Sequence, residues 1–235
     1  MSPGGEIMEV TVFLPCRRGS QRVPDKNTRP FAGYAHGLIE IKLKQILAAR
    51  GVHKVVLSTN DEEILAFAKG LGESRLQLHR RDNALGSNDT STDALIAHAA
   101  TLISGGHILW THVTSPFFGV REYERAIEAY NKALDGGFDS LMTASVLRSF
   151  LWDKEKPVNY DRAKTKWPHT QDLPPFYEIN NAVFLASADI YHFSNDRIGT
   201  RPCFYPVDKI TGFDIDWLDD FELAERLAQA GIASV

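Results

Sequence analysis

Apolar and polar residues alternate in blocks along the chain, and the blocks predict strands and helices in turn. Val10–Leu14 is a run of β-branched and aromatic residues that is typical of a buried strand. Leu38–Ala49 carries apolar residues at helical spacing, and Gly51 then favours a helix end. Thr59–Ile64 places a capping side chain and acidic residues at the start of another helix, which we expect to run to about Lys69.

The same patterns predict the remaining elements. We expect strands at Lys54–Ser58, Arg75–His79, His107–Trp110 and Ser140–Val146, and helices at Thr92–Leu102, Val120–Leu134 and Leu218–Leu227. Because strands and helices alternate, the sequence predicts an α/β fold with parallel neighbours in the sheet and helices on both faces.

The composition narrows the class of protein. A chain of 235 residues fits one α/β domain, 1–235, with or without an arm. Its formal charge of −4 gives no general attraction to nucleic acid or to a membrane, and no apolar stretch reaches the ~18 residues of a membrane span. Met1–Glu6 lacks the features of a signal peptide. With Cys16 and Cys203 as the only cysteines, we expect no disulfide framework and a cytoplasmic location.

A basic loop, Leu14–Asn27, follows the first predicted strand. It holds four cations within ten positions, namely Arg17, Arg18, Arg22 and Lys26. Loops at the carboxyl ends of strands are where α/β folds bind ligands, and Gly19 lets backbone N–H groups approach an anion. The loop contains neither a P-loop motif nor GxGxxG. It is therefore either a polyphosphate-binding loop or a solvated basic turn.

This loop resembles the signature R-x-x-S-x-R-x-P-x-K of the sugar-activating cytidylyltransferases, which include the acylneuraminate cytidylyltransferases and relatives acting on other acidic sugars. The matching residues are Arg17, Ser20, Arg22, Pro24 and Lys26. The resemblance implies a three-layer α/β/α nucleotide-diphospho-sugar transferase fold, Rossmann-like, with a mixed and mostly parallel sheet. It also implies that the loop wraps the CTP triphosphate, with Pro15, Cys16, Arg17, Ser20, Gln21, Arg22, Lys26 and Asn27 binding the nucleotide. Many sialic-acid enzymes carry Lys in place of Gln21.

A second stretch, Arg81–Thr92, resembles the family motif R-P-x-x-L-A-x-D-x-A-S, which reads the cytosine. Arg81 matches the arginine, Asp89 matches the aspartate after one extra residue, and Ser91 lies near the helix start. Cytosine offers O2 and N3 as acceptors, which an arginine can satisfy. The alternative is an ordinary helix cap beside solvated arginines.

The stretch after His107–Trp110 resembles the family's Q-P-T-S-P, which lies next to the sugar. Thr114 matches, while His112 replaces the glutamine. The resemblance implies that both residues bind the sugar, and His112 could titrate near neutral pH. The alternative is a loop histidine whose hydrogen bonds are satisfied within the protein.

The regular pattern breaks from Arg148 to Tyr177, a segment rich in aromatic residues and proline. It is too aromatic for a disordered linker and too long for a plain loop. In the family this region is an arm that crosses a homodimer interface and helps to close the partner's sugar site. Gln171 and Asn180 match sugar-facing positions. Asn181 replaces a glycine, and asparagine adopts left-handed backbone geometry more readily than most residues.

Two departures leave the sugar open. Thr170 and Glu178 stand where sialic-acid enzymes carry arginines, the first of which pairs with the sugar carboxylate. The sugar is therefore sialic acid, a Kdo-like sugar or another nonulosonate. Substitutes for the missing cation are His169, Arg148, Lys164 and Lys166.

Near the C-terminus, the stretch from Asp214 to Asp220 matches the family motif D-I-D-x-x-x-D. Residues two apart in a strand point to one side, so Asp214 and Asp216 at a strand end can converge on a cation. Oxygen ligands and a phosphate substrate point to Mg²⁺. Asp220 falls in the first turn of the last helix and is more easily explained as structural. The alternative for the pair is a turn with solvated acids.

The resemblance implies that CTP and an acidic sugar give CMP-sugar and pyrophosphate, with Arg17, Arg22 and Lys26 as the catalytic cations. Loss of one such group is expected to cost ~10²–10³ in rate. The sequence identifies no general base. A nucleotide-binding homologue without turnover is the alternative that leaves catalysis out.

Overall fold

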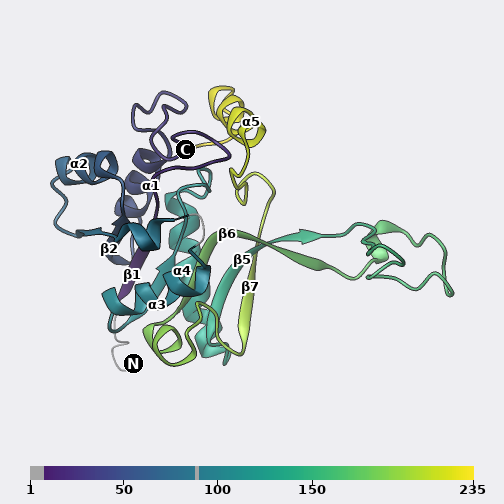
Figure 1. The fold of residues 1–235 in the computed structure, drawn as a ribbon. Coiled ribbons are helices and arrows are strands. Elements are labelled where there is room, and N and C mark those ends of the chain that lie inside the picture. The colour runs from purple at the N-terminus through teal and green to yellow at the C-terminus, as the bar shows by residue number, and fades with distance from the viewer. Residues whose placement is uncertain (1–7, 88–89) are drawn as a thin grey trace.

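Seven strands of the described residues form one sheet in the order β3-β2-β1-β4-β6-β5-β7 (Figure 1). This computed structural model describes residues 8–87 and 90–235, so Met1–Glu6 and Asp89 lie outside it. The strands are β1 (Val10–Pro15), β2 (Val52–Thr59), β3 (Leu76–Arg80), β4 (His107–Trp110), β5 (Ser140–Leu147), β6 (Phe176–Ser187) and β7 (Pro202–Val207).

Helices form where the pattern predicts them, with ends shifted by one or two residues. They are α1 (Gly37–Ala48), α2 (Glu62–Gly70), α3 (Thr92–Leu102), α4 (Val120–Asp135) and α5 (Leu218–Gln229). Side chains cap two of them, since Asp61 accepts from the N–H groups of Glu63 and Ile64, and Ser91 accepts from that of Ala94. Short turns at Asn83–Gly86, Thr170–Asp172 and Ile190–Ser194 (η1 to η3) complete the set.

The winding of the chain reverses between β1 and β4. Strands β3, β2, β1 and β4 are parallel, whereas β6 runs antiparallel to both β4 and β5, and β7 is parallel to β5. The chain moves outward from β1 to β3 and then returns to place β4 on the other side of β1. A crevice outside the carboxyl ends of β1 and β4 is where such a sheet binds ligands.

Two hydrophobic clusters lie on opposite faces of the sheet. Along β1, Val12 and Leu14 belong to one cluster and Phe13 to the other, as alternation in a strand requires. The first cluster receives residues of α1, α2, α4 and α5, and the second receives residues of α3 and η3. The predicted three-layer α/β/α fold with a mostly parallel sheet is therefore confirmed.

The predicted arm is visible as a projection from the sheet (Figure 1). The outer parts of β5 and β6 stay paired, with Leu147 opposite Phe176, and the chain between them forms the tip. Trp152 donates from its indole to the Tyr160 hydroxyl at 3.0 Å, so the tip is ordered by its own contacts. Trp152 and Trp167 are 45% and 62% exposed, which is unusual for tryptophan.

Gly37 sets the junction between the basic loop and α1. Its φ is +58°, a left-handed geometry that favours glycine, and an added Cβ there overlaps the Arg29 carbonyl oxygen. Two residues later, the Ile39 N–H donates to the Asn27 carbonyl at 2.9 Å. The start of α1 therefore holds the end of the basic loop in place.

We predict that Gly37→Ala lowers the free energy of unfolding by at least about 2 kcal/mol, because it adds backbone strain and a clash with Arg29. Gly70→Ala is the matched control: an added Cβ meets nothing within 4 Å there, so its effect should be neutral or slightly stabilising. Urea unfolding of both variants measures the difference. Equal stability of the two variants would contradict the account of this junction.

Candidate active site

A cavity of about 640 Å³ opens at the carboxyl ends of β1 and β4, within the usual range for a ligand site. Thirteen of the predicted site residues line it, namely Pro15, Cys16, Arg17, Ser20, Gln21, Arg22, Lys26, Asn27, Arg81, His112, Thr114, Asp214 and Asp216. Three do not: Ser91, Gln171 and Asn180. The basic loop, the segment after β4 and the C-terminal acids therefore meet, although they are far apart in the sequence.

The basic loop is folded onto its own polar groups. Gly19 has a φ of +80°, and the Ser20 hydroxyl accepts from the Val23 N–H at 3.3 Å. Asn27 donates from its side-chain amide to the Arg17 carbonyl at 3.0 Å. The loop is thus preorganised as a curved strip beside the cavity, with Ser20 and Asn27 contributing to its shape.

The lining of the cavity is positively charged. Its cations are Arg17, Arg22, Lys26, Arg81 and Arg197, against the carboxylates of Asp214 and Asp216. The chain as a whole carries −4, so the positive lining is local. Such a lining favours a polyanion such as a triphosphate.

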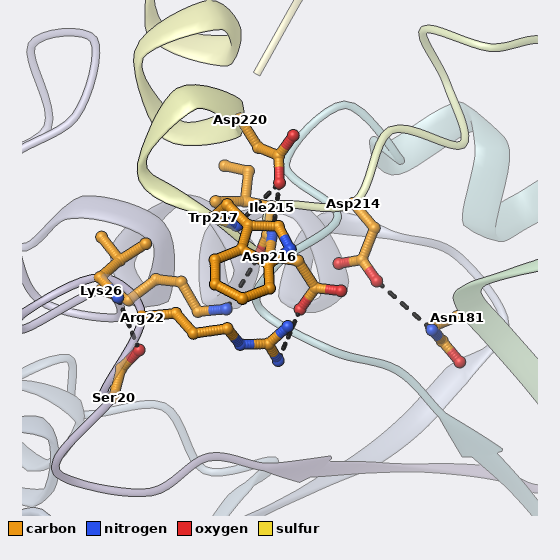
Figure 2. Close-up of polar contacts among 10 residues, drawn as sticks. Ser20, Arg22, Lys26, Asn181, Asp214, Ile215, Asp216, Trp217 and Asp220 are labelled. Atoms are coloured by element: carbon orange, nitrogen blue, oxygen red, sulfur yellow. Dashed lines mark hydrogen bonds and ion pairs between the residues drawn. The ribbon is translucent and has the colours of Figure 1, made fainter.

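Two of these cations contact the acidic segment directly (Figure 2). The Arg22 guanidinium pairs with the Asp216 carboxylate at 2.9 Å, where both side chains are about half exposed. The Lys26 ammonium is buried and donates to the Ile215 carbonyl at 2.7 Å. Burial lowers the pKa of Lys26, and the nearby Asp216 and Asp214 partly offset that shift. Two predicted phosphate ligands therefore hold the acidic segment, Arg22 through the Asp216 carboxylate and Lys26 through the backbone of Ile215.

The acidic segment is extended but belongs to no strand, so the expected strand end is wrong. The physical reason is that Ile215, not a strand partner, fixes it. Its N–H donates to the Thr114 carbonyl at 2.9 Å, and its side chain is fully buried in the core. With Ile215 facing inward, both flanking acids face the cavity, as residues two apart do in extended backbone.

Asp214 is the more enclosed acid. Its Oδ2 accepts from the Asn181 amide at 3.3 Å, and the Thr114 side chain also hydrogen-bonds to the carboxylate. Its Oδ1 is buried and has no hydrogen-bond partner among the described residues. Burial raises the pKa of Asp214, with the charge of Asp216 adding to the shift and the two hydrogen bonds opposing it.

These acids fit a hard divalent cation. The unpartnered buried oxygen of Asp214 is a ready ligand for one, and Asp216 borders the same space. In the described parts of the chain, no group of three or more His, Cys, Asp or Glu could hold a metal ion by itself. Mg²⁺ commonly binds one or two carboxylates and takes further oxygens from substrate phosphates. Asp220 has a different task, because its Oδ2 accepts from the N–H groups of Asp216 and Trp217.

Arg81 is buried beneath the basic loop. Its Nη2 donates to the Cys16 carbonyl at 2.7 Å, while Nε and Nη1 have no partner among the described residues. Unpaired buried donors cost free energy, which points to a ligand acceptor that completes them. Burial raises the pKa of the Cys16 thiol to about 12, so Cys16 lines the cavity as a neutral group and not as a nucleophile.

His112 lies in the cavity wall with a neutral imidazole, which the sequence did not predict. Its Nε2 accepts from the Trp110 indole at 2.9 Å. Burial, together with the nearby Arg197, lowers the pKa of His112 to about 3. The expected titration near neutral pH is therefore wrong, because a protonated Nε2 can no longer accept that bond. His112 is a neutral wall residue.

The three residues outside the cavity have other positions. Ser91 caps α3, and Gln171 is exposed on the arm. Asn180 is buried, and its amide lies 3.4 Å from the Ser145 hydroxyl. The neighbouring Asn181 lines the cavity instead, because β6 bulges here and Asn181 takes the left-handed φ of +60° that its residue type allows.

The sequence did not indicate Arg197 or Trp110 as site residues, yet both line the cavity. Arg197 follows η3 in a stretch without any family motif, so only the folded chain brings it to the site. Trp110 ends β4, and its burial pattern alone marks a core residue. The left-handed backbone at Asn181 was the one signal for a missed residue.

Comparison with known proteins agrees with the geometry. A family model described as "Cytidylyltransferase" matches residues 11–234. The chain is 24% identical to pseudaminic acid cytidylyltransferase of Campylobacter jejuni, covering 94% of this chain and 96% of that protein. It is 26% identical to CMP-N,N'-diacetyllegionaminic acid synthase of Legionella pneumophila, covering 94% and 97%.

The fold has a solved counterpart as well. The structure of CMP:2-keto-3-deoxy-manno-octonic acid synthetase complexed with CTP superposes with a TM-score of 0.66 at 14% identity, over 95% of this chain and 99% of that one. None of the helices in the part of the chain that the structure describes has the length and apolar character of a membrane span.

We predict that Asp214→Asn raises the melting temperature at pH 7 by ~2–4 °C, since the fold disfavours the charged form of this buried carboxyl. A folded-state pKa above the unfolded value of about 4 means that the native protein gains stability as the pH falls toward 4. The difference in melting temperature between Asp214→Asn and the native protein should therefore become smaller as the pH is lowered from 7 to 4.

Asp216→Asn is the control, because it removes the same charge from a half-exposed pair and should change stability by less than about 1 kcal/mol. A lower melting temperature for Asp214→Asn at pH 7 would contradict this account of Asp214.

Proposed function

We propose that this chain, which belongs to the cytidylyltransferase family, activates an acidic sugar with CTP to give a CMP-sugar and pyrophosphate. One observation carries the proposal: a single cavity combines a positively charged loop after β1 with the carboxylates of Asp214 and Asp216. The names of the two relatives, which act on pseudaminic and legionaminic acids, support an acidic sugar.

In the proposed reaction, the anomeric hydroxyl oxygen of the sugar attacks the α-phosphorus of CTP in line. The new O–P bond forms as the bond from the α-phosphorus to the bridging oxygen breaks, pyrophosphate leaves, and the hydroxyl proton passes to water. Negative charge grows on the α-phosphate oxygens and on the leaving pyrophosphate. Arg17, Arg22 and Lys26 line the cavity and would stabilise that charge from fixed positions.

Asp214 and Asp216 would hold Mg²⁺, which supplies a Lewis acid for the phosphate oxygens when it is bound. In this proposal, the ion pair between Arg22 and Asp216 opens when the substrate binds. When CTP enters, the Arg22 guanidinium can move to a phosphate, and the Asp216 carboxylate becomes available to the cation. Each charged group exchanges one opposite charge for another, so neither is left unpaired.

Cytosine recognition would fall to Arg81. Its Nε and Nη1 are buried donors without protein partners, and cytosine presents acceptors at O2 and N3. Uracil carries a donor at N3 in place of that acceptor. The pattern of unpaired donors therefore favours CTP over UTP.

The arm, residues 148–177, supports a homodimer. In this chain Gln171 is exposed on the arm and does not line the cavity. A second chain would have to bring its arm over the cavity for Gln171 to reach the sugar. Exposed Trp152 and Trp167 enclose the Arg162 guanidinium, at 5.4 and 5.3 Å from their ring centres, and form an aromatic surface suited to an interface.

We predict that the protein releases pyrophosphate from CTP in the presence of Mg²⁺ and one of a panel of acids: N-acetylneuraminic, pseudaminic, N,N'-diacetyllegionaminic and 2-keto-3-deoxy-manno-octonic acid. UTP, ATP and GTP should give far less product. Turnover should stop with EDTA and return with added Mg²⁺. Stabilisation in melts by CTP without turnover on any acid would indicate a nucleotide-binding homologue instead.

The matched variants for this assay are Arg22→Met and Arg18→Met. Arg22 lines the cavity, so its loss should lower kcat/KM by ~10²–10³. Arg18 is exposed on the same loop and lies outside the cavity, so its loss should leave the rate nearly unchanged. Equal effects would mean that only the overall charge of the loop matters.

We predict that light scattering at micromolar concentration gives twice the mass of one chain, and that Trp167→Ala shifts the protein toward monomer and lowers its activity. Phe193→Ala is the control, because Phe193 is 86% exposed but lies on η3, outside the arm. A fully active monomer would rule out the proposed role of the arm.

A further inference from the structure

Arg197 is a cation that the proposed reaction has not yet used. Its guanidinium lies over the Phe184 ring, 3.6 Å from the ring centre, and 5.3 Å from that of Trp110. The side chain is partly buried and borders the cavity. Contacts with two rings restrict the position of the guanidinium, and they engage its face and leave its N–H groups for a ligand.

No carboxylate of the described residues forms an ion pair with this guanidinium. Among residues 8–87 and 90–235, the Arg197 side chain also makes no hydrogen bond. The adjacent Asp196 acts on the guanidinium only through its charge, because its Oδ1 accepts from the backbone N–H groups of Arg197 and Ile198 at 2.6 and 3.3 Å. The charge of Asp196 and the ring contacts offset part of the cost of burying this cation, and a ligand anion bound to its N–H groups would offset more.

The position of Arg197 selects which anion that is. The phosphate loop follows β1 and the cytosine-facing Arg81 follows β3, whereas the ring partners of Arg197 come from β4 and β6. Trp110 and Phe184 lie opposite each other in those two strands. Trp110 also donates to His112, which is in the segment predicted to meet the sugar. Arg197 is thus on the side of the cavity that the nucleotide residues do not occupy.

The other cations suggested for the sugar carboxylate lie elsewhere. The suggested substitutes Arg148, His169, Lys164 and Lys166 all lie on the arm, outside this cavity. Arg197 is in the cavity of the same chain and needs no partner subunit.

We propose that Arg197 binds the carboxylate of the acidic sugar and so makes the site selective for an acid over a neutral sugar; this inference rests on the proposed function. A planar guanidinium matches the two oxygens of a carboxylate in a bidentate pair. The stacked rings hold it in that orientation before the sugar arrives.

The test uses the acid of the panel that the full-length protein turns over and the carboxamide of that acid. Arg197→Met should raise the KM for the acid by about 10–100-fold, the range for a charge-assisted hydrogen bond, while the KM for CTP stays within about twofold. Arg197→Lys should raise the KM for the acid by a smaller factor than Arg197→Met does. Arg201→Met is the matched control, because Arg201 also lies over an aromatic ring, that of Phe138, but is outside the cavity.

The carboxamide separates a carboxylate contact from a general effect on folding. For the native protein, the KM for the carboxamide should exceed the KM for the acid by about the factor by which Arg197→Met raises the KM for the acid. The variant should have similar KM values for the two sugars. If the variant still prefers the acid as strongly as the native protein does, the inference is overturned. A loss of CTP affinity alone would also overturn it and assign Arg197 to the phosphates.

These outcomes are separate from those of the proposed function. If the native protein turns over no acid at all, the proposed function fails. If the native protein turns over an acid and Arg197→Met has the same KM for it, only the inference about Arg197 fails. The melting temperature of each variant, measured alongside, identifies a variant that does not fold, and the comparison of acid with amide in the native protein still holds.

Discussion

The bond between the Lys26 ammonium and the Ile215 carbonyl joins the two ends of the active site. The two residues are 189 positions apart, and the bond is buried, so it links the loop after β1 to the segment before α5 at the floor of the cavity. A buried ammonium is tolerated here because a carbonyl accepts from it and Asp214 and Asp216 lie near it. The two acids in turn tolerate each other because that charge is close. Lys26 and the two acids therefore compensate one another's charge where the two ends of the site meet.

A second buried lysine positions the segment after β4. The Lys42 ammonium on α1 donates to the carbonyls of Ser115 and Phe118 at 2.8 and 3.1 Å, and burial lowers its pKa to about 7. Neutral or charged, an amine can donate both bonds, so the segment stays in place through that change. Thr114 precedes Ser115 and accepts from the Ile215 N–H. The helix after β1 thus supports the residue that fixes the acidic segment.

The sequence predicted five of the seven strands, the five long helices and most of the residues that line the cavity, because these depend on local signals; it did not predict β6 and β7. Strand and helix periodicity, the capping signal at Thr59–Ile64 and the dense cations of the basic loop are all readable over a few positions. The sugar side was less predictable, because it depends on distant contacts. The bulge in β6 decides that Asn181 and not Asn180 faces the cavity. The burial of His112 lowers its pKa, and no property of its neighbours in sequence shows that burial.

Two of the proposed catalytic cations, Arg22 and Lys26, contact the acidic segment with different strength. A cavity with five cations and two acids must attract a polyanion and also remain folded when none is bound. The pair of Arg22 and Asp216 is half exposed, and such pairs contribute little stability, so it costs little to open. The contacts of Lys26 and Ile215 are buried and costly to break, so they stay. The groups proposed to move are thus the weakly held ones, and the groups that shape the cavity are the strongly held ones.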